Sequence, residues 1–232
     1  MSKEPTKPLK ITMTLKDGRI ASSDGIIMFD SILYHGWFAK HAPHVLRGVG
    51  CDGYDVKIGL PLHQLPGNRW AASKAVYDCI DCHVEYYNKR PDFFAPDKMK
   101  YLSKEKGIID DSAGKFRAYR NPVVIRVAKN GELTFFCKGR ADAIIDLLSY
   151  IPAAGKKPSM GWGIIDDIRI EEMGADYSAF HPQYGLMRPM PIEDAKAYPD
   201  FDFSKYPIME YGVKPPYWKP CNATLCYVPI MK

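Results

Sequence analysis

The sequence predicts an α+β fold of the ferredoxin-like kind, an antiparallel sheet with two helices. The first observation is an alternation of apolar and polar residues over 9–15, followed by apolar residues at helical spacing over 29–39. The second is a later series in which two strand patterns precede a helix pattern and a last strand pattern. These later elements are expected at residues 116–127, 133–137, 141–150 and 164–170. The resulting order β-α-β-β-α-β is that of the ferredoxin-like fold.

The first helix should present Phe29, Leu33 and Trp37 to the core. Residues 69–87 are predicted to form another helix, which would place Cys79 and Cys82 on one face as small packed side chains. Both predictions depend on helical spacing of the apolar residues.

Asn130-Gly131 is a strong hairpin signal, because both residues readily adopt the positive φ that a tight turn needs. We therefore expect the strands on either side, at 123–127 and 133–137, to pair with each other. The helix over 141–150 should bury Ala141, Ile144, Ile145 and Leu148 on one face.

The glycine-rich loop before the last strand carries the most functional information. Three glycines within residues 155–163 permit positive φ and close approach of the backbone to a ligand, and Lys156 and Lys157 add two cations. Successive N–H groups in such a loop can form an anion-binding concavity. The spacing is neither that of a P-loop nor GxGxxG, and the loop connects a helix to a strand. A clamp for a polynucleotide backbone fits this pattern; a glycine-rich turn with solvated lysines is the alternative.

Trp162, between Gly161 and Gly163, has two interpretations. Its ring can stack on a base, or it can plug the core against the first helix. We expect partial burial.

The charge of the chain is modest as a whole but unevenly distributed. There are 32 Lys and Arg against 27 Asp and Glu, which gives +5. Residues 112–140 carry seven basic residues and one acid, whereas residues 166–210 carry ten acids and four basic residues. This asymmetry indicates a polyanion on one side of the molecule, or two solvated faces of opposite sign.

The C-terminal region holds nine prolines between Pro182 and Pro229. Such a density excludes long regular elements. We expect a mostly extended tail that wraps the domain, with a short edge hairpin near residues 225–229.

Several classes of function are disfavoured. No apolar stretch is long enough to span a membrane, and the charged first ten residues lack the apolar core of a secretory signal, so we expect a cytoplasmic protein. No HExxH, GxSxG or acidic metal cluster is present. A zinc site that combines Cys79, Cys82 and His83 with Cys221 or Cys226 stays open as a minor alternative.

Four segments give the chain a resemblance to the RAMP superfamily of CRISPR-associated proteins. They are residues 11–15 with 25–33 (GIIMFDSIL), GKKPSMGWG at 155–163, WAAS at 70–73 and LMRPMP at 186–191. More narrowly, the chain resembles the small subunit of type IV CRISPR effector complexes that caps the 5′ handle of the guide RNA (crRNA).

The resemblance implies a non-enzymatic RNA-binding subunit without cofactors. It implies an RNA-recognition-motif-like core over residues 1–49 and 115–173, an inserted thumb over 50–114 and the C-terminal wrap over 174–232. The implied partners are the crRNA 5′ handle, a CRISPR backbone filament subunit, the large effector subunit and target DNA beside the flanking motif, with no membrane.

The resemblance also suggests particular contacts. By position, the handle contacts are Gly155, Lys156, Lys157, Ser159, Gly161, Trp162 and Gly163, and the thumb contacts are Arg69, Trp70 and Lys74. The charge pattern independently adds the basic strand residues Arg117, Arg120, Lys138 and Arg140.

A different class of function is a metal-independent endoribonuclease that processes precursor crRNA. Such an enzyme needs a few side chains around a 2′-hydroxyl, and His35, His41 or a nearby Tyr are the candidates.

Overall fold

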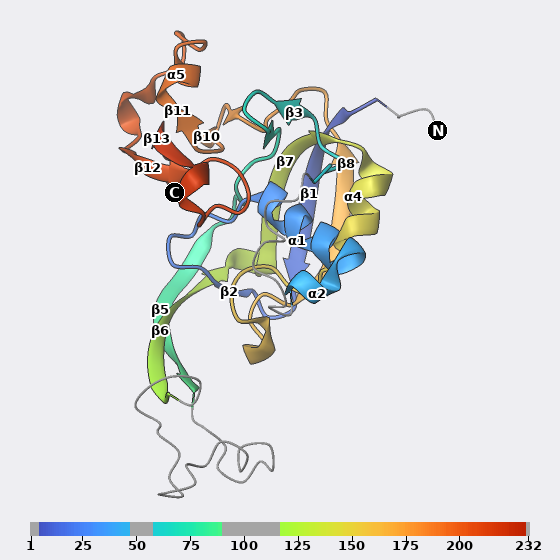
Figure 1. Cartoon of the computed structure of the whole chain (residues 1–232), viewed down its shortest axis with the longest axis vertical. Coiled ribbons are helices and arrows are strands. Elements are labelled where there is room, and N and C mark those ends of the chain that lie inside the picture. The colour runs from blue at the N-terminus through green and yellow to red at the C-terminus, as the bar shows by residue number, and fades with distance from the viewer. Residues whose placement is uncertain (1–4, 47–57, 90–116, 231–232) are drawn as a thin grey trace, which may run out of the picture.

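A computed structural model describes residues 5–46, 58–89 and 117–230 (Figure 1). Its centre is an antiparallel sheet in which β1 (Lys7–Leu15) lies between β7 (Glu132–Gly139) and β8 (Ile165–Glu172). The alternation seen in the sequence gives β1 one buried face, because Leu9, Ile11, Met13 and Leu15 all point into the core. The expected mixed α/β fold with antiparallel sheets is confirmed.

A fourth extended segment flanks this sheet. Residues 72–76 run beside β7, with Ser73 N–H donating to the Phe136 carbonyl at 2.8 Å. Val76 and Thr134 exchange two backbone hydrogen bonds of 2.7 and 2.9 Å. The spatial order is therefore residues 72–76, β7, β1 and β8.

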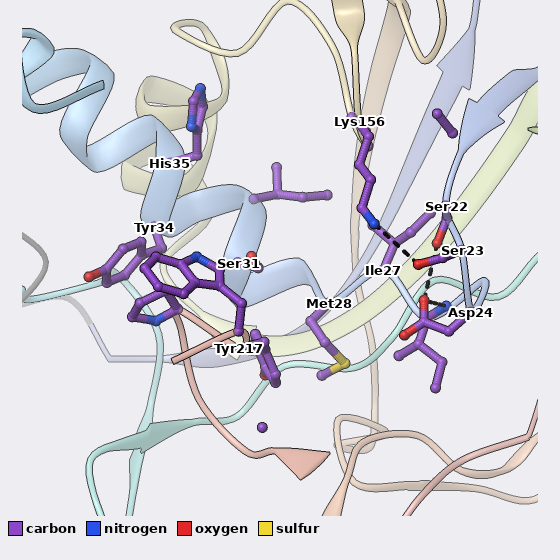
Figure 2. Close-up of a pocket in the computed structure, with 18 of the residues that line it drawn as sticks. Ser22, Ser23, Asp24, Ile27, Met28, Ser31, Tyr34, His35, Lys156 and Tyr217 are labelled. Atoms are coloured by element: carbon purple, nitrogen blue, oxygen red, sulfur yellow. Dashed lines mark hydrogen bonds between the residues drawn. The ribbon is translucent and has the colours of Figure 1, made fainter. Parts of the chain in front are cut away.

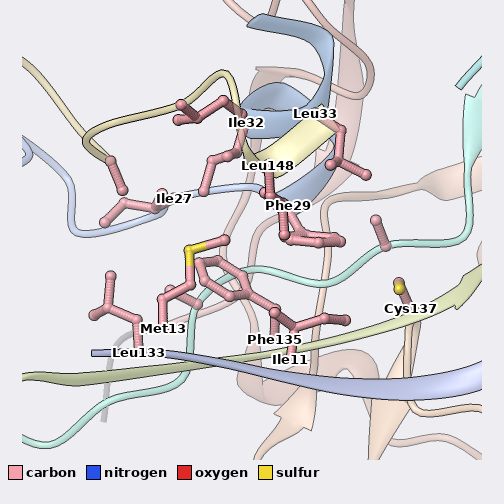
Figure 3. Close-up of a cluster of buried hydrophobic side chains, with 14 of the residues drawn as sticks. Ile11, Met13, Ile27, Phe29, Ile32, Leu33, Leu133, Phe135, Cys137 and Leu148 are labelled. Atoms are coloured by element: carbon pink, nitrogen blue, oxygen red, sulfur yellow. The ribbon is translucent and has the colours of Figure 1, made fainter. Parts of the chain in front are cut away.

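Two helices, α1 (Phe29–His41) and α4 (Ala141–Leu148), cover one face of the sheet, and the short α2 (Pro43–Leu46) follows α1. Phe29 packs on Phe135 with ring centroids 5.2 Å apart, inside the cluster drawn in Figure 3. A side chain at Gly36 would clash with the Leu147 carbonyl and with Ile151. Glycine at this position therefore allows α1 and α4 to approach closely.

A long two-stranded arm projects from the core (Figure 1). It consists of β5 (Cys79–Lys89) paired with β6 (Tyr119–Ala128), and the short β2 (Arg19–Ala21) pairs with the base of β6. We refer to β5 and β6 as the arm.

The arm corrects two predictions. The prediction of a helix over residues 69–87 is wrong, because residues 82–88 alternate exposed and half-buried side chains and pair with a distant strand. The prediction that residues 123–127 and 133–137 pair with each other is also wrong. Asn130 and Gly131 adopt the expected positive φ of 56° and 70°, but β6 pairs with β5 and β2, while β7 pairs with β1 and residues 72–76.

The C-terminal region is folded rather than an extended wrap. Its sheet has the order β11 (Met190–Pro191), β13 (Ala223–Tyr227) and β12 (Ile208–Gly212), with α5 (Ile192–Ala195) and a separate apolar cluster around Leu186 and Met190. The high density of prolines is compatible with this folded structure because each of these strands and helices has at most five residues. The expected edge hairpin is wrong, because β13 is the central strand. We call residues 174–230 the C-terminal unit.

Two further short pairings are β3 (Gln64–Leu65) with β4 (Arg69–Trp70), and β9 (Phe180–His181) with β10 (Gly185–Leu186). None of the described helices is long and apolar enough to cross a membrane.

A buried polar network joins the C-terminal unit to the core. Arg188, 1% exposed, donates to the carbonyls of Trp70 and Val213. Tyr217 donates its hydroxyl to the carboxylate of Asp30, in the first turn of α1, at 2.9 and 3.0 Å. Burial raises the pKa of Asp30 to about 6, against the opposing effects of the Arg188 charge and the Tyr217 hydroxyl.

Candidate nucleic-acid interface

The glycine-rich loop is closed at its base by its own backbone. Ala154 N–H donates to the Gly163 carbonyl at 2.8 Å, and Gly163 N–H donates to the Arg19 carbonyl at 2.8 Å. Gly163 has φ of +70°, and a Cβ there would overlap the carbonyl oxygen of Ala154. This glycine therefore serves close packing within the protein, not approach to a ligand.

The loop does not offer the backbone concavity that its glycines suggest. Five of its N–H groups donate to backbone carbonyls of the protein; they belong to Ala154, Lys156, Met160, Gly161 and Gly163. What the loop exposes is its side chains, Lys156, Lys157 and Ser159. We conclude that anion binding here depends on the lysines.

Trp162 is buried more completely than expected. It is 1% exposed and packs against Ala21 of β2 and Ile125 of β6, rather than against the first helix. Its ring is therefore unavailable for stacking on a base and instead fixes the root of the arm to the loop.

The loop also meets the arm through an exposed contact. The Lys157 ammonium lies 4.1 Å from the centroid of the Tyr87 ring, and Arg120 covers the neighbouring Tyr86 at 3.8 Å. Tyr87 and Tyr119 form a further aromatic pair at 6.1 Å. Because successive strand residues point to opposite faces, Lys157 joins Tyr87 and Tyr119 on one face of the arm, and Arg120 joins Tyr86 on the other face. Cations interleaved with aromatic rings are typical of surfaces that bind single-stranded nucleic acid.

A cavity of about 870 Å³ opens on the other side of the loop. Figure 2 shows Lys156 entering it from the loop, Tyr34 and His35 from α1, and Tyr217 from the C-terminal unit. Partial desolvation lowers the pKa of His35, so its imidazole is neutral at pH 7.

The comparisons with known proteins identify the family. The family model described as "CRISPR type IV associated protein Csf3" matches residues 7–229. The chain belongs to the type IV CRISPR-associated Csf3 family. The resemblance stated from the sequence is thereby confirmed.

Among solved structures, the chain is similar to one in "Crystal structure of Csm3-Csm4 subcomplex in the type III-A CRISPR-Cas interference complex". The sequence identity is 11%, the match covers 95% of this chain and 90% of that chain, and the TM-score is 0.39. No curated protein matches the chain.

In this Csf3-family chain, the sites predicted from the sequence fall in three places. The loop residues Gly155, Lys156, Lys157, Ser159 and Gly161 are exposed, whereas Trp162 and Gly163 are buried. Arg117, just before β6, and Arg120, on β6, are both exposed. They lie toward the same end of the arm as Tyr87, which Lys157 contacts.

The expected thumb residues Arg69, Trp70 and Lys74 do not lie on the arm. Arg69 is buried, forms an ion pair with the Asp194 carboxylate of the C-terminal unit and donates to the Pro66 carbonyl. Lys74 is buried, and its backbone N–H donates to the Met187 carbonyl. These residues hold the C-terminal unit on the core. Of the expected thumb, residues 50–57 and 90–114 lie outside the described residues.

The basic strand residues are divided rather than joined into one surface. Lys138 and Arg140 lie at the end of β7 that leads into α4, whereas Arg117 and Arg120 lie on the distal part of the arm (Figure 1). The open face of the core sheet carries paired charges, with Lys10 3.6 Å from Glu171. Phe136 on that face is buried beneath Tyr177 and His181.

The cysteines do not form the alternative zinc site. Cys79 and Cys82 lie on a strand, not on a helix face, and Cys226 is buried in the C-terminal unit. Across residues 5–46, 58–89 and 117–230, no three His, Cys, Asp or Glu side chains gather as metal ligands would.

Sequence reasoning missed the aromatic residues of the arm and those of the cavity. Tyr86 and Tyr87 were hidden by the helix prediction, although their alternation with polar neighbours is a strand signal. Tyr217 and Trp218 follow two prolines in a region expected to be an extended wrap, and no local pattern links them to α1.

Proposed function

We propose that this chain is the crRNA-binding subunit of a type IV CRISPR ribonucleoprotein effector, capping the 5′ handle of the guide. Membership of the Csf3 family supports a role in a CRISPR effector complex. The observation that carries the RNA contact is the exposed pair Lys156 and Lys157, of which Lys157 lies against the arm residue Tyr87. Lysines neutralise phosphates, and tyrosine rings stack on bases without regard to sequence.

The arrangement of the core agrees with this proposal. The order residues 72–76, β7, β1, β8, with α1 and α4 on one face, supports a ferredoxin-like or RNA-recognition-motif-like core. We propose that RNA follows the loop and the arm. It does not lie on the open sheet face, where acidic side chains already pair with basic side chains.

The partners that complete the proposal are protein subunits and DNA. We expect the C-terminal unit to contact protein, such as the backbone filament or the large subunit, rather than RNA, because its six acidic and five basic residues leave no excess of positive charge to attract phosphates. Target DNA beside the flanking motif would pass near this subunit within the complex.

The test is co-expression with a CRISPR array and candidate partner subunits, followed by pull-down of this chain and sequencing of the bound RNA. The wild type should recover short guides that begin at one fixed repeat position. Lys156→Glu/Lys157→Glu should lose them. The control Lys196→Glu/Lys205→Glu reverses two exposed lysines in the C-terminal unit and should keep them. Equal recovery with both double variants would overturn the proposed contact.

One observation favours a second candidate function. His35, whose pKa is lowered by partial desolvation, lies in the same cavity as Lys156 and Tyr34, which are the residue types of a metal-independent ribonuclease. Incubation of the complex with labelled precursor crRNA in EDTA tests it. Specific cleavage that disappears in His35→Ala would support the enzyme; intact precursor would leave the chain a binding subunit.

A further inference from the structure

The cavity beside the glycine-rich loop has walls from four separate parts of the chain. They are residues 21–28, the first turns of α1, the start of the glycine-rich loop and residues 210–223 of the C-terminal unit. Its volume of about 870 Å³ exceeds that of a single nucleobase and lies in the range of small-molecule sites.

The inner surface of this cavity is apolar and aromatic. Ile27, Met28 and Ile32 line it from the core side, as Figure 2 shows for Ile27 and Met28. Tyr34 and Tyr217 add ring surfaces, and Trp218 lies on the lining with 70% of its surface exposed. An exposed indole is the side chain best suited to stack on a flat heterocycle.

The mouth of the cavity is polar and carries a cation. Lys156 Nζ donates to the hydroxyl of Ser23 at 3.1 Å and makes no salt bridge within the described ranges. Asp24 also lines the mouth, but both its carboxylate oxygens are engaged within the protein. One accepts from the Ser22 hydroxyl and the Ile26 N–H, and the other accepts from the Tyr211 hydroxyl at 2.7 Å. The positive charge of Lys156 is therefore directed outward. Besides Asp24, the other carboxylate that lines the cavity belongs to Glu210.

The wall formed by the C-terminal unit is fixed before any ligand arrives. The Tyr217 hydroxyl is held by buried Asp30, and the Asn222 side chain donates to the Pro216 carbonyl at 3.1 Å. A preformed wall reduces the ordering cost of binding.

From these features we infer that the cavity receives an extruded nucleobase of the bound RNA, stacked on Trp218, with the adjoining phosphate against Lys156. This inference rests on the proposed function and adds a site to it. The size of the cavity accommodates the ribose together with the base. The apolar floor excludes water from the base, and Ser31 of α1 adds a hydroxyl to the lining that can reach a base edge.

The experiment uses the full chain with its guide RNA. Guides carry 5-iodouridine at one position at a time, and the crosslinked peptides are identified by mass spectrometry after irradiation. One position should crosslink to Trp218 while its neighbours do not. The affinity for the same guide is measured by fluorescence anisotropy.

Two variants test the cavity from opposite sides. Trp218→Ala removes an exposed ring, and Ser31→Tyr fills the space from α1. Each should abolish the crosslink at that position and weaken guide binding about tenfold, as the loss of one stacked base does. Tyr198→Ala, which removes a 44%-exposed ring of the C-terminal unit outside the cavity, is the control and should change neither.

The outcomes separate this inference from the function on which it rests. If the wild type binds guide but no position crosslinks to Trp218 and neither variant weakens binding, the cavity is not a base site, while the proposed function stands. If the wild type binds no guide, both fall. If the variants release a partner subunit and leave guide binding intact, the cavity takes a protein side chain and the inference is overturned.

Discussion

The C-terminal unit and the arm are both additions to the core sheet, but they are attached in different ways. The C-terminal unit is joined through buried polar groups: Arg188 and Asp30 are almost completely inaccessible, and Tyr217 bonds to the latter. The arm is joined through the small apolar cluster of Trp162, Ala21 and Ile125 and through the exposed contact of Lys157 with Tyr87.

This difference indicates what each addition does. Buried polar groups demand their partners, so the C-terminal unit is part of the fold and forms one wall of the cavity. A two-stranded ribbon has little stability of its own, and beyond β2 the arm pairs only with itself in the described residues. The arm is therefore an extension whose outer surface is available to other molecules, with Ile80, Val84 and Tyr86 at least half exposed.

The largest expected effect concerns the attachment of the C-terminal unit. Arg188→Ala leaves Asp30 buried without its neighbouring charge and two carbonyls without their donor, so the free energy of unfolding should fall by about 3–5 kcal/mol. Urea denaturation measures it. The control Arg169→Ala removes an arginine from exposed ion pairs and should cost less than about 1 kcal/mol. Equal costs would show that the network does not hold the unit.

The next effect concerns the root of the arm. Trp162→Ala empties the cluster beneath β6 and should lower the free energy of unfolding by about 3 kcal/mol. Amide hydrogen exchange should accelerate in residues 119–128 more than in β1. Trp218→Ala removes the same side chain from an exposed position and should cost less than about 1 kcal/mol. Unchanged protection of β6 in the Trp162 variant would contradict this account of the arm.

The pH dependence of stability separates the two attachments further. Because burial raises the pKa of Asp30 to about 6, the folded protein binds a proton there more tightly than the unfolded chain does. Its contribution to stability is complete below pH about 4 and is lost as the pH rises through about 6, by about 2–3 kcal/mol.

Denaturation at several pH values between 4 and 7 measures this slope. Asp30→Asn should flatten it, whereas Trp162→Ala should leave it unchanged, because the cluster of Trp162, Ala21 and Ile125 contains no titrating group. A slope that persists in Asp30→Asn would assign it to other residues.

The smallest expected effect is the exposed contact between loop and arm. A double-mutant cycle with Lys157→Ala and Tyr87→Leu should give a coupling energy of about 0.5–1 kcal/mol, the usual value for an exposed cation–π pair. Hydrogen exchange of the arm amides gives the four free energies. The pair Lys157 and Tyr177 has no such contact and should show no coupling.

Local patterns were sufficient for much of the core. The strand at 9–15, the helix beginning at Phe29, the helix beginning at Ala141 and the strand after the glycine-rich loop all form as predicted. Each of these has an apolar period that matches its own burial, so neighbouring residues carry the information. The exception is Ile145 of α4, which was expected on the buried face and is 52% exposed.

The elements that sequence reasoning missed depend on distant partners. β5 is a strand because residues 119–128 pair with it, and Trp162 is buried because β2 and β6 lie beneath it. The candidate site likewise has a part that local sequence could predict and a part that depends on distant residues. The exposure of Lys156 and Lys157 could be predicted, but the cavity joins α1 to Tyr217, which is more than 180 residues away in sequence.

The closed base of the glycine-rich loop has a consequence for how such a protein can diversify. The hydrogen bond and close packing between Ala154 and Gly163 fix both ends of the segment, so the end of α4 and the start of β8 are unaffected by what lies between them. Lengthening an exposed loop costs little, about 0.6 kcal/mol for each doubling. Insertions and deletions between Lys156 and Gly161 are therefore nearly neutral for folding, and a lineage can alter the reach of this segment without rebuilding the sheet that carries it.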